Sequence, residues 1–261
     1  MNFELKIMGT ASAMPISDRN PSAQVLSVHG RLFLIDCAEG TQQQIRRAHL
    51  SFLKIEAVFI SHIHGDHVFG IFGLLSTMAM YGRTAPLYVY GPQALGSVLK
   101  FYSSFFSEGS NFEVVFTPVD SKEPRIVHES KYVKVSAFPL NHKIECYGYR
   151  FDGIPSERHP DVPSYAYCSD TAPFEALSSY VKGVKVLYHE ATYPAEMKDK
   201  AAFRYHSTTQ DAALCALRSG AQKLLIGHYS SRISDFDALL KECTDIFPNS
   251  VLCHDLMELR F

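Results

Sequence analysis

Short β-rich runs alternate with helical stretches along almost the whole chain, and this alternation restricts the folds that the sequence can adopt. In the first half, neighbouring strands are expected at residues 24–28 and 31–35, joined as a hairpin by His29 and Gly30. In the second half, most expected strands are followed by a helix. This order of elements favours an α/β sandwich, in which two mixed sheets pack face to face and helices lie outside.

The helical periodicity predicts six helices, at residues 41–48, 67–80, 93–105, 173–180, 209–218 and 235–247. No linker divides the chain, so we expect one domain over residues 1–261. The proline-rich, polar segment PSERHPDVP at residues 155–163 predicts a short exposed flap, approximately residues 151–164.

The composition indicates a soluble globular protein. The chain has 261 residues, of which 46% are apolar, and a formal net charge of −2, which excludes a disordered chain. The N-terminal sequence MNFELKIMGT has no charged head followed by an apolar block, and the most apolar stretch, residues 68–81, is too short to span a bilayer. None of the six cysteines forms a CxxC pair. We therefore expect reduced thiols, a cytoplasmic location and no membrane partner.

The segment FISHIHGDH at residues 59–67 is the strongest chemical signal. It places His62, His64, Asp66 and His67 directly after an apolar strand. Imidazole and carboxylate groups suit Zn²⁺ or a similar divalent ion. His62 and His64 can point to one side of an extended segment, whereas Asp66 and His67 follow a glycine that permits a turn. The four residues therefore predict ligands for two neighbouring metal ions.

Three further ligand-type residues, His142, Asp170 and His228, each follow the end of an apolar strand. Each alone is ambiguous, because a single histidine after a strand is commonly a structural or surface residue. Together they complete a two-metal site in which Asp170 bridges the ions. We expect one ion to be bound by His62, His64 and His142, and the other by Asp66, His67 and His228.

These residues, in the pattern HxHxDH followed by His142, Asp170 and His228, resemble the metallo-β-lactamase superfamily. Four further stretches resemble its ribonuclease Z branch, the tRNA 3′-processing endonucleases. They are DCAEGTQ at residues 36–42, the pair HEAT at 189–192 and HSTT at 206–209, HYSSR at 228–232, and FPNSV at 247–251. The metal motif marks only the superfamily, whereas the HEAT and HST pair is much more specific.

The resemblance implies a four-layer αββα sandwich of two mixed sheets with helices outside. It also implies a phosphodiesterase that cleaves 3′ trailers from precursor tRNA with a water activated by two metals. The expected cofactors are two Zn²⁺ per subunit, with Mn²⁺ as the alternative, and the expected assembly is a homodimer.

The resemblance implies catalytic roles for three residues. Asp66 is the expected general base, besides being a ligand, and His206, held by Glu190, is the expected general acid. Arg19, Asn20, Ser230 and Arg232 are the expected substrate contacts. Asp36 is expected either to orient a metal-binding histidine or to serve a local turn. Glu39 is expected to favour a helix N-terminus.

Two departures from the family pattern concern substrate binding. Ser17 stands where the family's N-terminal loop commonly has a lysine. Only twenty residues separate Tyr149 from Asp170, so the long arm with which the family grips the tRNA body does not fit.

Other functions remain open at this point. A cyclic-nucleotide or other small-molecule phosphodiesterase on the same fold agrees with the short arm. A lactamase or thioesterase would leave His206 and Glu190 without a role. A catalytically inactive RNA-binding scaffold is a third alternative, but every expected metal ligand is present.

Overall fold

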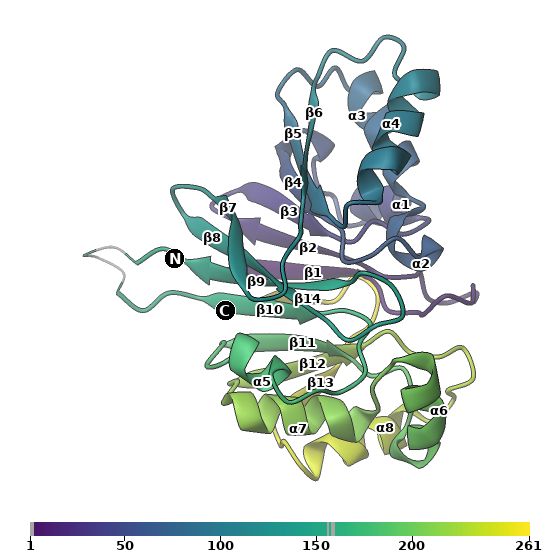
Figure 1. Cartoon of the computed structure of the whole chain (residues 1–261), viewed down its shortest axis with the longest axis vertical. Coiled ribbons are helices and arrows are strands. Elements are labelled where there is room, and N and C mark those ends of the chain that lie inside the picture. Colours follow the sequence, from purple (N-terminus) through teal and green to yellow (C-terminus); the bar gives the residue numbers. More distant parts are fainter. Residues whose placement is uncertain (1–2, 156, 158–159) are drawn as a thin grey trace. The chain divides into compact units, whose positions relative to one another are not determined.

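The structure, a computed structural model, describes residues 3–155, 157 and 160–261. The described chain forms two compact units, each with its own seven-stranded mixed sheet (Figure 1). The first unit contains residues 3–120 and 255–260, and the second contains residues 121–254 with Phe261. The two mixed sheets agree with the expected fold class.

The sheet of the first unit has the strand order β14-β1-β2-β3-β4-β5-β6. The pairs from β14 to β3 are antiparallel, and those from β3 to β6 are parallel. The strands are β1 (Phe3–Gly9), β2 (Ala23–Val28), β3 (Arg31–Ile35), β4 (Ile55–Phe59), β5 (Leu87–Gly91), β6 (Val114–Pro118) and β14 (Glu258–Arg260).

The sheet of the second unit repeats this pattern in the order β13-β12-β11-β10-β9-β8-β7. The pairs from β7 to β10 are antiparallel, and those from β10 to β13 are parallel. The strands are β7 (Arg125–Glu129), β8 (Val133–Pro139), β9 (Tyr147–Gly153), β10 (Ser164–Cys168), β11 (Val186–Glu190), β12 (Lys223–Gly227) and β13 (Ser250–Leu252). In both sheets, the parallel half is the half whose strand ends carry most of the expected site residues.

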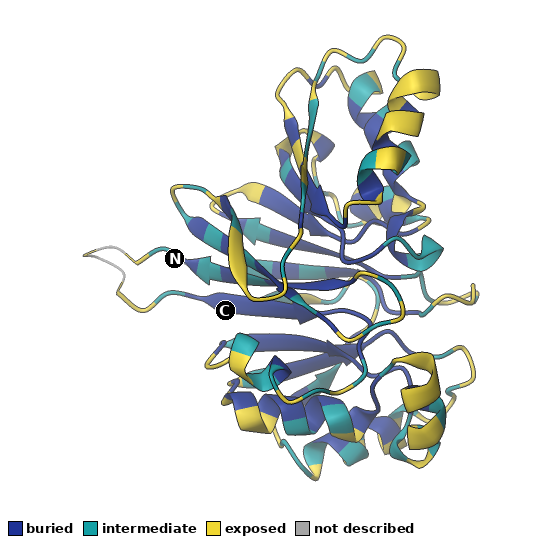
Figure 2. Cartoon of the chain, viewed as in Figure 1, coloured by how far each residue is buried: buried dark blue, intermediate teal, exposed yellow. Residues whose placement is uncertain are grey.

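Helices cover one face of each sheet, and Figure 2 shows buried residues along both the strands and the helices. Apolar side chains of the helices and of the sheet form one buried cluster in each unit. The first unit has α1 (Thr41–Arg47), α2 (Gly65–Val68), α3 (Ile71–Met80) and α4 (Leu95–Phe106), with a short 3-10 helix at Phe52–Lys54. The second has α5 (Leu177–Tyr180), α6 (Lys198–Arg204), α7 (Thr209–Ser219) and α8 (Phe236–Thr244), with a 3-10 helix at Ala195–Met197. Leu74 and Met78 of α3 pack on the first sheet, and Ala212 and Ala216 of α7 on the second.

The prediction of a single helix at residues 67–80 is wrong, because this segment forms parts of two helices, α2 and α3. The backbone N–H of Gly70 donates to the carbonyl of Cys37 (2.8 Å) instead of continuing the helix. A Cβ at position 70 would lie 2.0 Å from the carbonyl oxygen of Ala38. Glycine therefore lets the break pack tightly against the loop that follows β3.

The expected flap at residues 151–164 overlaps the ends of two paired strands. Residues 151–153 belong to β9 and Ser164 to β10, and Gly153 N–H donates to Pro163 O (2.9 Å). Residues 156, 158 and 159 of the expected loop lie outside the described residues. In the part of the chain that is described, no helix is long and apolar enough to cross a membrane.

The close contact at Gly70 gives a test of this packing. Gly70→Ala should lower the free energy of unfolding by about 1–3 kcal/mol, because the added methyl group overlaps backbone atoms that cannot move independently. The measurement is urea denaturation. The control is Gly82→Ala, where no atom lies within 4 Å and only a positive φ of 69° opposes a side chain. A smaller loss at Gly70 than at Gly82 would contradict the tight packing.

Candidate metal and catalytic site

Three imidazoles converge just after β4 in the first unit. His62, the third residue after the strand, is buried, and its Nε2 lies 3.0 Å from Nδ1 of His64. The ring of His67, on the short helix α2, lies with its centroid 4.1 Å from that of His62. Asp66 is on the same helix, and its Oδ2 is 3.4 Å from His67 Nε2. The four residues of the HxHxDH motif therefore form one cluster.

The buried carboxylate of Asp36, at the end of β3, holds this cluster in place. It accepts hydrogen bonds from the backbone N–H of Ser61 (2.7 Å) and from the Ser61 hydroxyl (2.9 Å). It also lies 2.8 Å from Nδ1 of His67. A carboxylate of this kind orients metal-binding histidines. Asp36 itself has a left-handed φ of 56°, so it also forms part of the local turn.

These bonds fix the hydrogen on each ring. Because the Asp36 carboxylate only accepts, Nδ1 of His67 carries the hydrogen and Nε2 presents a lone pair. Ser61 donates its only hydroxyl hydrogen to Asp36, so the hydroxyl accepts from Nδ1 of His62 at 3.0 Å. Nε2 of His62 then carries no hydrogen and presents a lone pair, as Nε2 of His67 does. Neutral imidazole in this form is the species that binds a divalent metal.

The second unit gathers another set around Asp170, which follows β10. Its Oδ1 is 3.2 Å from Nε2 of His228, which follows β12. Its Oδ2 is 3.9 Å from Nε2 of His142, which follows β8, and 3.9 Å from Nε2 of His206. His142 Nδ1 donates to the carbonyl of Tyr205 (3.0 Å), which leaves its Nε2 unprotonated. Each unit thus carries a cluster of imidazole and carboxylate groups suitable for divalent metal ions.

A buried carboxylate also supports the second cluster. Glu190, the last residue of β11, lies with Oε1 3.0 Å from Nδ1 of His206. Its two oxygens accept three backbone N–H bonds, from Thr171 (3.2 Å), Thr192 (2.9 Å) and Ser207 (2.8 Å). Burial alone would raise the pKa of Glu190, but the charge and hydrogen bond of His206 outweigh it and hold the pKa below its ordinary value. Glu190 is therefore an ionised acceptor that orients His206.

Thr192 is a functional residue to which sequence reasoning assigned no role. Its hydroxyl donates to Glu190 Oε2 (2.7 Å) and lies 2.8 Å from Nδ1 of His228. Having given its hydrogen to Glu190, the hydroxyl accepts from His228, whose Nε2 then presents a lone pair toward Asp170. The quoted HEAT box includes this threonine, but only the fold brings it within reach of His228.

The expected substrate contacts are distributed over both units. Arg19 and Asp66 line the same cavity in the first unit, with a volume of about 850 Å³. Asn20 has a structural role, because its backbone and side-chain N–H groups donate to Asp255 Oδ2 (2.8 and 3.0 Å). In the second unit, Ser230 N–H donates to Thr192 O (3.2 Å), and Arg232 is exposed.

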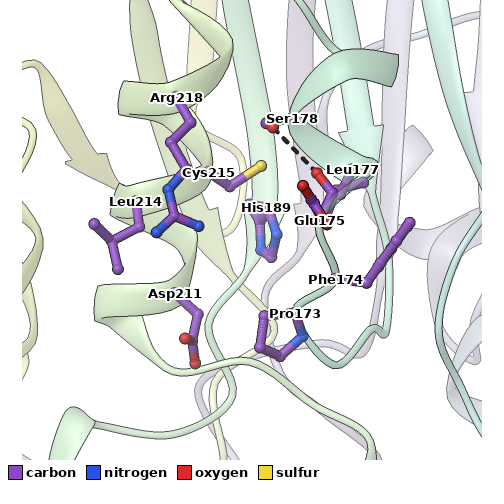
Figure 3. A pocket seen from close by; sticks show the side chains of 10 residues that line it. All are labelled: Pro173, Phe174, Glu175, Leu177, Ser178, His189, Asp211, Leu214, Cys215 and Arg218. Carbon is purple, nitrogen blue, oxygen red and sulfur yellow. Dashed lines mark hydrogen bonds between the residues drawn. The ribbon is translucent and has the colours of Figure 1, made fainter.

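His189, the first residue of the HEAT box, faces a different cavity. This cavity, of about 680 Å³, lies between α7 and residues 173–178, with His189 of β11 between them, and Figure 3 shows its lining side chains, which include Cys215 and Arg218. The Nδ1–H of His189 donates to the carbonyl of Glu190 (2.7 Å), and burial lowers the pKa of the imidazole. His189 therefore supports the backbone of Glu190 as a neutral ring.

Comparison with known proteins agrees with this chemistry. A family model described as Beta-lactamase superfamily domain matches residues 31–229. Ribonuclease Z of Bacteroides thetaiotaomicron is 35% identical over 297 residues, which cover 98% of this chain and 94% of that protein. Ribonuclease Z of Porphyromonas gingivalis is 34% identical over 299 residues, which cover 98% of each chain.

A solved structure shares the fold. The crystal structure of human tRNase Z, short form, superposes with a TM-score of 0.82 at 26% identity and covers 98% of each chain. This similarity confirms the expected metallo-β-lactamase type of fold. With relatives of more than 30% identity over nearly its whole length, the chain belongs to the β-lactamase superfamily and, within it, to the ribonuclease Z family.

Proposed function

We infer that this protein is a hydrolase that cleaves the 3′ trailer from precursor tRNA, the endoribonuclease activity of the ribonuclease Z family. The observation that carries the inference is the Glu190–His206 pair beside Asp170. Nδ1 of His206 is bonded to a buried carboxylate, and its Nε2 lies 3.9 Å from a carboxylate oxygen of the expected metal site. A positioned proton donor at such a site suits the expulsion of a poor alkoxide leaving group. The names of the relatives supply the substrate class.

We propose that seven side chains bind two divalent ions. His62, His64 and His142 would hold one ion, Asp66, His67 and His228 the other, and Asp170 would bridge them. The lone pairs at Nε2 of His62, His67, His142 and His228 support this proposal. A donor set rich in imidazole, with carboxylates, favours Zn²⁺, and Mn²⁺ is the alternative.

The chain's own residues then have distinct tasks in the reaction. Bound divalent ions supply Lewis acidity, which acidifies water and offsets negative charge at the phosphate. Asp66 orients the attacking water and accepts its proton. Protonated His206 donates from Nε2 to the leaving 3′-oxygen, because its Nδ1–H is held by Glu190. The cluster of backbone donors around Glu190 keeps that carboxylate fixed while His206 changes its protonation state.

The short connection between β9 and β10 favours one alternative function. The alignment with the Bacteroides protein spans 297 positions, more than the 261 residues of this chain, so the relative has segments that this chain lacks. A chain without a long arm would suit a small or cyclic-nucleotide phosphodiester, which needs no distant grip.

One assay separates the two functions. Purified protein should cut a 3′-extended precursor tRNA at the 3′ end of the acceptor stem, where the trailer begins, and sequencing of the product ends maps the cut. A 2′,3′-cyclic nucleotide and the same tRNA without a trailer serve as comparison substrates. Efficient turnover of the cyclic nucleotide with an intact precursor tRNA would contradict the tRNA-processing function.

We also propose a homodimer, in which the partner or another surface holds the tRNA body in place of the missing arm. Sedimentation equilibrium tests this point, since a strictly monomeric protein that processes precursor tRNA efficiently would exclude it. We retain a cytoplasmic location as part of the proposal. The burial of all six cysteines as thiols supports it, and burial raises the pKa of Cys215 and Cys243 to about 12, which keeps these two unreactive. Detection of the protein in a periplasmic or secreted fraction would contradict this location.

The metal assignment predicts a change in metal content. His62→Ala and His142→Ala should each reduce the bound metal from about two ions per chain, measured by inductively coupled plasma mass spectrometry, because each removes one imidazole ligand. His49→Asn is the control, since His49 is exposed and asparagine tolerates its left-handed φ of 55°. Full metal content in both alanine variants would refute the assignment.

The general-acid role predicts a dependence on the leaving group. His206→Ala should slow cleavage of precursor tRNA by about 10²–10⁴-fold while the metal content stays unchanged. The loss should be smaller for a nitrophenyl phosphodiester, whose leaving anion is stable without a proton. Glu190→Gln should show the same pattern more mildly, and His62→Ala should depress both reactions alike. Equal losses on both substrates for His206→Ala would show that the residue positions the substrate instead.

A further inference from the structure

An exposed phenylalanine stands beside the metal-binding turn of the first unit. Phe69 directly follows α2, which carries Asp66 and His67, and 73% of its surface is exposed. The neighbouring residues His67, Val68 and Ile71 are all buried. The ring of Phe69 is therefore the exposed apolar group in a segment whose other apolar residues are buried.

The turn itself leaves room for this ring. A Cβ on Gly65 would lie 2.3–2.7 Å from three ring carbons of Phe69. One edge of the ring therefore rests against the bare backbone of Gly65, between His64 and Asp66. Glycine at this position fixes where the ring lies, and the exposed part of the ring remains available to another molecule.

The ring also lines a cavity with the dimensions of a ligand site. The cavity of about 850 Å³ is lined by Phe69, Gly65 and Asp66, by Arg19 and Glu39 from two loops, and by Gln43 from α1. It thus combines an aromatic ring and a guanidinium with side-chain amides and with the carboxylates of Glu39 and Asp66. Proteins bind single-stranded nucleotides by stacking the base on an aromatic ring and pairing a cation with the phosphate.

We propose that Phe69 is the stacking platform for the base of a nucleotide that flanks the cleaved bond, with Arg19 facing that nucleotide's phosphate. The proposal rests on the proposed function and names a subsite for it. Stacking accepts any base, because every base has a π-face, so the subsite suits an enzyme that meets trailers of different sequence. It also holds the RNA next to Asp66 without a long arm.

The test is a double-mutant cycle between protein and RNA. Precursor tRNAs are prepared with a normal or an abasic nucleotide at each of the two positions flanking the cut, and kcat/KM is measured for wild type, Phe69→Leu and Phe69→Tyr. Phe105→Leu is the matched control, because Phe105 is 68% exposed on α4 of the same unit. A 2-aminopurine at the same positions reports stacking by its quenching on binding, and the chain has no tryptophan to interfere.

On normal RNA, Phe69→Leu should lower kcat/KM by roughly 5- to 150-fold, the usual value of one base–aromatic stack. Phe69→Tyr and Phe105→Leu should stay within about twofold. At one of the two positions, the abasic RNA should lower wild-type cleavage by a similar factor and should abolish the effect of Phe69→Leu. The 2-aminopurine signal at that position should be quenched by wild type and not by Phe69→Leu.

Two results would overturn the proposal, and they are distinguishable. In the first, wild type cleaves precursor tRNA, but the factors by which Phe69→Leu and the abasic nucleotide lower kcat/KM multiply at both positions. The ring then does not stack on either base, and this result refutes the subsite but not the proposed function. If wild type hydrolyses a nitrophenyl phosphodiester but no precursor tRNA, the proposed function fails, and the subsite fails with it.

Discussion

A buried carboxylate that must be fully hydrogen-bonded stands behind the histidines of each unit. An ionised carboxylate without partners in a protein interior is strongly unfavourable, so the fold has to supply donors at Asp36 and Glu190. The donors are backbone N–H groups and one hydroxyl in each case, from Ser61 and Thr192. The other hydrogen bonds of the carboxylates and hydroxyls determine which nitrogen of each imidazole carries no hydrogen. The same hydrogen bonds therefore stabilise the two buried charges and leave the histidines ready to bind a metal ion.

The strand order explains why these groups come together within each unit. Asp36 and the HxHxDH segment follow β3 and β4, which are adjacent parallel strands, so both lie at the same edge of the first sheet. Asp170 and His228 follow β10 and β12, and Glu190 ends β11; these three strands are also adjacent and parallel. Carboxyl ends of parallel strands meet at one edge of a sheet, which is where ligands commonly bind in open α/β sheets. Asp170 and His228, which are 58 positions apart in sequence, thus become neighbours because their strands belong to the same parallel half of the sheet.

Much of this arrangement could be predicted from the sequence, because strand ends and ligand types are local properties. The two mixed sheets and the positions of His62, His142 and Asp170 after strands follow from hydrophobic patterning. Features that depend on partners far away in sequence were not predictable. The division at Gly70 depends on the carbonyl of Cys37, the role of Thr192 on His228, and that of Asn20 on Asp255. Helix α6 was missed because only Ala201 in KDKAAFR is buried, so the segment has no apolar periodicity.

The single hydrogen of a hydroxyl group limits how the sequence can vary. At positions 61 and 192 the side chain must donate once to a carboxylate and accept once from an imidazole. Valine fills nearly the same volume as threonine but can do neither, and asparagine or glutamine is too large for a fully enclosed place. Neutral drift at these two positions is therefore confined to exchange between serine and threonine, even though neither residue touches a metal ion or substrate in the proposed reaction.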